Sequence, residues 1–90
     1  MYKIEVTNRF KQSLKKLEKD GYNLESLQKV IDMLARGEKL PEKYKNHPLK
    51  GNLKGYYDCH ILLDWVLIYK KEEQRLVLIL FDIGTHSDLL

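Results

Sequence analysis

The chain has 90 residues, enough for one hydrophobic core and too few for two, so residues 1–90 are expected to form a single domain. Hydrophobic residues make up 43% of the sequence, which excludes a disordered chain. The formal net charge of +3 is small, so the positions of the lysines matter more than their number.

The single cysteine, Cys59, excludes an internal disulfide and is typical of a reducing compartment. The longest apolar runs, such as Leu76–Phe81, are too short to span a bilayer. No basic segment followed by an apolar one opens the chain, so no secretory signal is predicted. We therefore expect a cytoplasmic protein that has no association with membranes.

The chain begins with a predicted strand and a predicted helix. Apolar and polar residues alternate over Tyr2–Val6, which is the pattern of a half-buried strand. Thr7 or Asn8 can then cap a helix, because the side-chain oxygen of either residue can accept a free backbone N–H. Asp20 and Gly21 end this helix.

A second helix follows after a short turn. Asn23 can cap its start and Gly37 ends it. Glu25 and Lys29 have the spacing of an ion pair on its outer surface. Because the turn between the helices is short, the two are expected to form an antiparallel hairpin.

The second half of the chain predicts a long loop and three strands. The loop covers Glu38–Asn52, and its length favours a functional role. The strands are expected at Gly55–Ile61, Trp65–Lys71 and Arg75–Asp82, and the tail Gly84–Leu90 is expected to form a helical turn.

The resulting order, β-α-α-β-β-β, predicts an α+β domain. We expect the helical hairpin to pack on one face of an antiparallel sheet, with a short C-terminal turn after the last strand. The other face of the sheet is expected to be partly open and to carry polar side chains.

Groups that can transfer protons gather between residues 44 and 65, where His47, Asp58, His60 and Asp64 lie. Strand alternation places Asp58 and His60 on one face, with Tyr56, while Cys59 lies on the other. Asp58 could orient the imidazole and favour its charged form, or both residues could belong to an ordinary solvated face. For Cys59, a buried and inert thiol is favoured over a nucleophile.

Two further positions have two interpretations each. Trp65 could be a core aromatic residue or a stacking surface for a base, and Asp64 a turn residue or a reacting carboxylate. Lys45, Lys50 and Lys54 could form a phosphate-binding arc around the His-containing loop or a solvated surface.

His86 follows the last predicted strand, so all three histidines lie at loops or strand edges. Their spacing matches no compact ligand motif and the chain has no cysteine cluster. No metal site and no cofactor are therefore predicted.

Four motifs occur in order along the chain: Tyr44-Lys45-Asn46-His47-Pro48-Leu49-Lys50-Gly51, Lys54-Gly55-Tyr56-Tyr57-Asp58-Cys59-His60, Asp64-Trp65-Val66-Leu67-Ile68-Tyr69 and Gly84-Thr85-His86-Ser87. Together they resemble the YafQ branch of the RelE/ParE toxin superfamily, and the resemblance extends over nearly the whole chain. It implies a RelE-like fold and a toxin of a type II toxin–antitoxin pair. Members are endoribonucleases (mRNA interferases) that cleave mRNA in the ribosomal A site without a metal.

The resemblance also implies partners and site residues. The partners are a DinJ-like antitoxin of the ribbon-helix-helix type, in a hetero-oligomeric complex, and mRNA with the ribosome. The implied catalytic residues are His47, Asp58, His60, Asp64 and His86. Trp65 is implied to bind RNA, and the lysine arc of Lys45, Lys50 and Lys54 would assist it.

Cleavage by attack of the ribose 2′-OH on the adjacent phosphate needs a base, an acid and donors that stabilise the phosphorane. Imidazoles suit the first two roles, since their ordinary pKa of about 6.5 lets one accept a proton while another donates it. We expect His86 to be the proton donor, His60 or Asp64 to be the base, and His47 to hold the phosphate with the lysines.

The chain departs from the family pattern at two positions. Asp82 stands where the family has an arginine, four residues before the last histidine, and Leu90 stands where it has an aromatic residue. Two alternatives stay open. One is a ParE-like toxin that acts by binding another target, which the three histidines disfavour, and the other is an RNA-binding module without catalysis, which Asp82 in place of an arginine keeps open.

Overall fold

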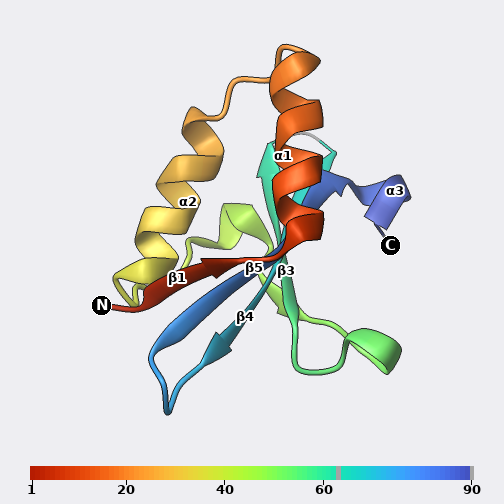
Figure 1. Cartoon of the computed structure of the whole chain (residues 1–90). Coiled ribbons are helices and arrows are strands. Elements are labelled where there is room, and N and C mark those ends of the chain that lie inside the picture. The colour runs from red at the N-terminus through yellow and green to blue at the C-terminus, as the bar shows by residue number, and fades with distance from the viewer. Residues whose placement is uncertain (63, 90) are drawn as a thin grey trace.

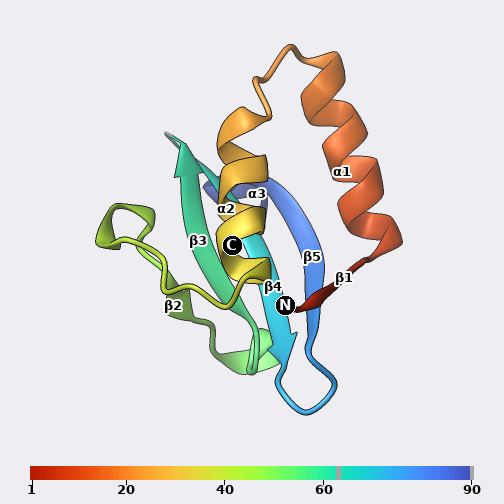
Figure 2. The same ribbon diagram turned by 90° about the vertical axis from the view of Figure 1, so that its left-hand side faces the viewer.

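A five-stranded sheet, with strand order β1-β5-β4-β3-β2, carries two long helices on one face (Figures 1 and 2). The computed structural model describes residues 1–62 and 64–89. The elements are β1 (Lys3–Val6), α1 (Asn8–Lys19), α2 (Glu25–Ala35), the 3-10 helix η1 (Glu42–Tyr44), β2 (His47–Pro48), the 3-10 helix η2 (Gly51–Leu53), β3 (Tyr57–Leu62), β4 (Trp65–Glu72), β5 (Val77–Thr85) and α3 (His86–Leu89). No helix among the described residues is long and apolar enough to cross a membrane.

The predicted α+β class and order of elements are confirmed, but the sheet is mixed rather than wholly antiparallel. β1 pairs in parallel with β5, with Lys3 opposite Val77, whereas the other neighbouring strands are antiparallel. β1 also lies at the edge of the sheet and is exposed rather than half-buried: Ile4 is 43% exposed. Alternation in a sequence predicts a strand, but it does not specify which strand will be its partner.

The helix ends follow local hydrogen bonding. Thr7 is the N-cap of α1, and its Oγ1 accepts the N–H of Phe10 at 3.0 Å. Asn23 Oδ1 accepts the N–H of Glu25 at 2.8 Å, although the N-cap position of α2 is Leu24. The expected Glu25–Lys29 ion pair is absent among the ion pairs of the described residues, so Lys29 is available for other contacts.

The long loop is ordered and contains a strand that the sequence did not reveal. β2 has only two residues and lies beside β3 (Figure 2). The two strands pair antiparallel, with His47 opposite Asp58. A strand this short has no recognisable period, and its proline hides it further. The register of β2 on β3 sets the position of the first histidine.

β5 differs most from the expected bounds, because it begins at Val77 and continues three residues beyond Asp82. His86 follows β5 directly and begins α3, which confirms the expected helical turn in the tail. Leu90, the last residue of that expected turn, lies outside the described residues.

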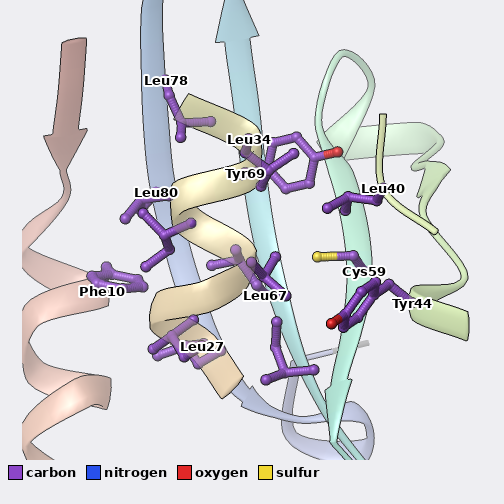
Figure 3. Close-up of a cluster of buried hydrophobic side chains, with 14 of the residues drawn as sticks. Phe10, Leu27, Leu34, Leu40, Tyr44, Cys59, Leu67, Tyr69, Leu78 and Leu80 are labelled. Carbon is purple, nitrogen blue, oxygen red and sulfur yellow. The ribbon is translucent and has the colours of Figure 1, made fainter. Parts of the chain in front are cut away.

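The core lies between the helices and one face of the sheet (Figure 3). Its buried side chains include Phe10 and Leu17 from α1, Leu27, Val30 and Leu34 from α2, and Cys59, Trp65, Leu67, Tyr69 and Leu80 from the sheet. Full burial of an apolar side chain of this size contributes roughly 1.5–3 kcal/mol, so this layer supplies much of the stability. As expected, Cys59 faces the helices.

The opposite face of the sheet is polar, but its centre is not open. Alternation places Asp58, Val66 and Ile68 there, and their side chains are at most 2% exposed. The expected opening of this face is therefore limited to the residues around its centre. A carboxylate buried on this face needs compensation from charge or hydrogen bonding.

We predict that Cys59→Ser lowers the free energy of unfolding by about 1–3 kcal/mol, because a hydroxyl buried among apolar side chains loses its hydrogen bonds to water. The thiol is fully buried, and burial raises the pKa of Cys59 to about 12. Urea denaturation of both proteins measures the loss. In the native protein the thiol should react with a thiol reagent only through unfolding, and fast labelling would contradict its burial.

Candidate functional site

His47 and Asp58 face each other across the short β2–β3 pair. His47 Nδ1 lies 2.9 Å from Asp58 Oδ1 and also 2.9 Å from the backbone oxygen of Lys45. The histidine side chain is about half exposed, whereas the aspartate side chain is fully buried. The carboxylate therefore supports an imidazole that solvent and substrate can reach.

These contacts assign the tautomer of His47. Two oxygens close to Nδ1 would repel a nitrogen lone pair, so Nδ1 carries a proton. The N–H geometry favours the Lys45 oxygen as acceptor. Nε2 is then the ring nitrogen left for the substrate, as an acceptor when the ring is neutral and as a donor when it is charged.

Asp58 is a buried carboxylate held by charge rather than by hydrogen bonds. Among the described residues, neither of its oxygens accepts a hydrogen bond. Burial raises the pKa of Asp58, and the positive forms of His47, His60 and His86 oppose that rise. All three histidines of the chain thus lie near one buried carboxylate.

His60 and His86 lie together although 26 positions separate them in the sequence. Their ring centroids are 5.9 Å apart. His86 is exposed at the start of α3, and its backbone N–H donates to the backbone oxygen of Asp64 at 2.7 Å. This bond joins the end of β5 to the β3–β4 turn and brings Asp64 into the neighbourhood of the histidines.

The structure thus gathers the five residues proposed as catalytic: His47, Asp58, His60, Asp64 and His86. We call the three histidines and Asp58 the histidine cluster. β2, β3 and the junction of β5 with α3 contribute its side chains. Pairing between strands, rather than spacing along the chain, forms this group.

Trp65 does not belong to the cluster. It is 1% exposed, and its ring centroid lies 5.7 Å from that of Tyr22 on the helix side of the sheet. The interpretation of Trp65 as a stacking surface is wrong for this structure, because no base could reach the ring. Trp65 is a core residue, the alternative that the sequence left open.

The predicted lysines occupy two places. Lys45 lies beside the histidine cluster, since its backbone oxygen contacts His47 and it lines a pocket next to His60. Lys50 and Lys54 are exposed at the two ends of η2. None of the three forms an ion pair within residues 1–62 and 64–89.

Asp82, one departure from the family pattern, is tied to α1. Its Oδ1 accepts bonds from Ser13 Oγ at 2.6 Å and from the backbone N–H of Ile83 at 2.8 Å. Its Oδ2 lies 3.4 Å from Nε of Arg9. These contacts give Asp82 a structural role. Leu90, the other departure, lies outside the described residues.

Sequence reasoning missed an aromatic pair formed by Tyr56 and Phe81. Their ring centroids are 5.0 Å apart. Lys70 Nζ lies 5.5 Å from the Tyr56 ring centroid, and the Arg9 guanidinium lies 5.6 Å from that of Phe81. The four residues come from distant segments, so no local pattern could have revealed their contact.

The described residues contain no group of three or more His, Cys, Asp or Glu side chains arranged to hold a metal ion. What the histidine cluster offers is acid–base chemistry: three imidazoles, a buried carboxylate near them and lysines at the margin.

Comparison with known proteins agrees with this geometry. Residues 2–90 match the family model described as a bacterial toxin of type II toxin-antitoxin system, YafQ. The mRNA interferase toxin YafQ of Escherichia coli is 35% identical over 88 residues, which cover 96% of this chain and 92% of that protein.

Solved structures of similar proteins have the same fold. A metal-bound toxin from Helicobacter pylori is 42% identical, with a TM-score of 0.92 and 100% of each chain covered. The matching chain of the E. coli DinJ–YafQ complex is 33% identical, with a TM-score of 0.90, and the match covers 100% of this chain and 99% of that one. The chain therefore belongs to the YafQ toxin family of type II toxin–antitoxin systems.

Proposed function

We propose that this toxin is a metal-independent endoribonuclease that cleaves mRNA in the ribosomal A site of the cytoplasm. The observation that carries the proposal is a chain of contacts: His47 lies 2.9 Å from the buried carboxylate of Asp58, His60 lies on the same face of β3 as Asp58, and the His86 ring centroid lies 5.9 Å from that of His60. The E. coli relative is an mRNA interferase, which supports RNA as the substrate.

The proposed reaction is attack of a ribose 2′-OH on the adjacent phosphate. His60 or Asp64 takes the 2′ proton, and His86 gives a proton to the leaving 5′ oxygen. The ring centroids of His60 and His86 lie 5.9 Å apart, close enough for the two imidazoles to contact the same phosphate. His47, with its proton held on Nδ1, contacts the phosphate through Nε2 when charged.

Asp58 acts on this reaction through His47. As an anion it favours the charged form of the imidazole, and the β2–β3 register keeps the two side chains together. Its burial without hydrogen bonds weakens the fold, because a buried charge is stabilised less than a hydrated one. We infer that Asp58 is present at this cost in stability because its charge serves the reaction.

Asp58→Asn, which keeps the shape and removes the charge, should slow cleavage on the order of 10–100-fold, as with other carboxylates that orient an imidazole. It should also stabilise the protein at neutral pH. Initial rates on ribosome-bound mRNA measure the first effect, and urea denaturation measures the second. An Asn variant of wild-type activity would remove Asp58 from the mechanism.

The stability effect has a predicted pH dependence. Because the pKa of Asp58 is raised in the folded state, its contribution to stability is complete below its unfolded pKa of about 4 and is lost as pH rises through the folded value. The advantage of Asp58→Asn in unfolding free energy should therefore grow between about pH 4 and neutrality. An advantage that is equal at both pH values would contradict the raised pKa.

His86→Ala should reduce cleavage by about 10²–10⁴-fold, the usual contribution of a positioned acid, and should abolish growth arrest. The side chain is exposed, so the melting temperature should change little. His86→Gln is the matched control, because it keeps a hydrogen-bond donor but cannot supply a proton. Recovery of activity in the Gln variant would show that His86 binds RNA without acting as an acid.

The same assay tests the need for a metal, since a Helicobacter pylori relative is metal-bound. Cleavage by the wild type should persist in EDTA, and loss of cleavage that Zn²⁺ or Mg²⁺ restores would overturn the metal-independent mechanism. Folded protein that arrests growth without cutting mRNA would instead indicate a toxin that acts by binding.

We also propose a partner, an antitoxin with an acidic, amphipathic C-terminal segment. The DinJ complex of the E. coli relative and the lysines around the histidine cluster support this choice. The affinity for the antitoxin encoded beside the toxin should fall as salt rises, because exposed charges are screened beyond about 10 Å at 0.1 M salt. Titration calorimetry at low and high salt measures this, and an unchanged affinity would count against the electrostatic contribution.

A further inference from the structure

A pocket of about 420 Å³ opens beside His60, between α2, η1 and β3. Three lysines line it: Lys29 from α2, and Lys43 and Lys45 from η1 and the residue that follows it. Ser26 of α2 adds a hydroxyl. We call this hollow the lysine pocket. His60 belongs to the lining of the pocket and also to the histidine cluster, and its side chain points to the other face of the sheet, so the pocket lies across the β3 edge from the reacting groups.

The charge of the lysine pocket is not compensated from within. Among the described residues, no aspartate or glutamate lines it. Lys29, Lys43 and Lys45 form no ion pair in the described part of the chain. Lys43 Nζ lies 5.1 Å from the Tyr44 ring centroid, which holds this ammonium near the lining. Three lysines in the lining of one pocket favour an anion of high charge density.

Two observations favour an RNA phosphate over an acidic peptide. The lysine pocket adjoins His60, to which we assign a role in cleavage. An RNA strand that crosses the histidine cluster would therefore pass the lysine pocket. The edge of β3 beyond β2 is also short: β2 pairs with Tyr57 and Asp58 only, and β3 ends at Leu62. The free part of this edge is shorter than the about five or six residues that strands most often have, which disfavours an added peptide strand.

We propose that the lysine pocket binds a backbone phosphate of the RNA strand that neighbours the scissile phosphate. Lys29 and Lys43 are the new members of the RNA-binding surface, and they join Lys45. The inference rests on the proposed function, since it supposes an RNA substrate. It adds the direction in which the strand leaves the site, from His60 toward α2.

The binding experiment uses a short single-stranded RNA with every 2′-hydroxyl methylated, which the toxin cannot cleave. Affinity is measured between about 0.05 and 0.2 M salt for the wild type, Lys29→Gln and Lys43→Gln. Each variant should lower the slope of log affinity against log salt by about 0.7, the value for one phosphate contact on a single strand. Lys15→Gln, an exposed charge-matched control on α1, should keep the wild-type slope.

Cleavage kinetics supply the second measurement. A phosphate contact remote from the reacting bonds is made equally in the ground state and the transition state, so its loss should raise KM several-fold and leave kcat unchanged. Lys15→Gln should change neither. Circular dichroism and melting temperature confirm that each variant is folded.

The outcomes separate this inference from the function on which it rests. If the wild type neither binds nor cleaves RNA, the proposed function and the lysine-pocket inference are both overturned. If the wild type binds and cleaves RNA, and Lys29→Gln and Lys43→Gln keep the wild-type salt slope of affinity and the wild-type KM, only the lysine-pocket inference is overturned. If a polyglutamate peptide binds the wild type as tightly as the RNA and shows the same dependence on Lys29, the pocket is a site for acidic protein segments and the RNA assignment is wrong.

Discussion

The close contact of His47 with the buried carboxylate of Asp58 is the interaction on which the site depends. It requires that a two-residue strand pair with β3 in one register, because a shift by one residue would turn Asp58 away from the imidazole. The carboxylate has no hydrogen-bond donor among the described residues, so its charge acts on the imidazoles nearby. The fold thus contains a group that weakens it, and in the proposed reaction that group acts through His47.

β3 shows how one strand serves both stability and chemistry. Cys59 and Ile61 point into the core beneath the helices, while Asp58 and His60 point to the other face. The core side is held by apolar burial, which is insensitive to charge. The polar side can therefore vary its protonation without disturbing the packing of the helices. This division explains why the two neighbours Asp58 and Cys59, both buried, have opposite roles.

Two positions of the family pattern illustrate how the surroundings decide a residue's role. Asp82 replaces an arginine, and the structure ties its carboxylate to Ser13 and Arg9 of α1. Trp65 keeps the family residue, yet it is buried against Tyr22. In both cases the packing of the helices on the sheet decides the role, and identity at a motif position does not.

The sequence by itself determined the α+β class, the two long helices, the strands other than β2 and the residue types of the candidate site, because periodicity, caps and motifs are local properties. Only the tertiary structure decided that β1 runs parallel to β5, that β2 exists, and that His60 meets His86. Each of these depends on pairing between residues far apart in the chain, which no local pattern encodes. Lys29 is a further example. It was expected to pair with Glu25, but the packing of α2 beside η1 and β3 places it in the lining of the lysine pocket.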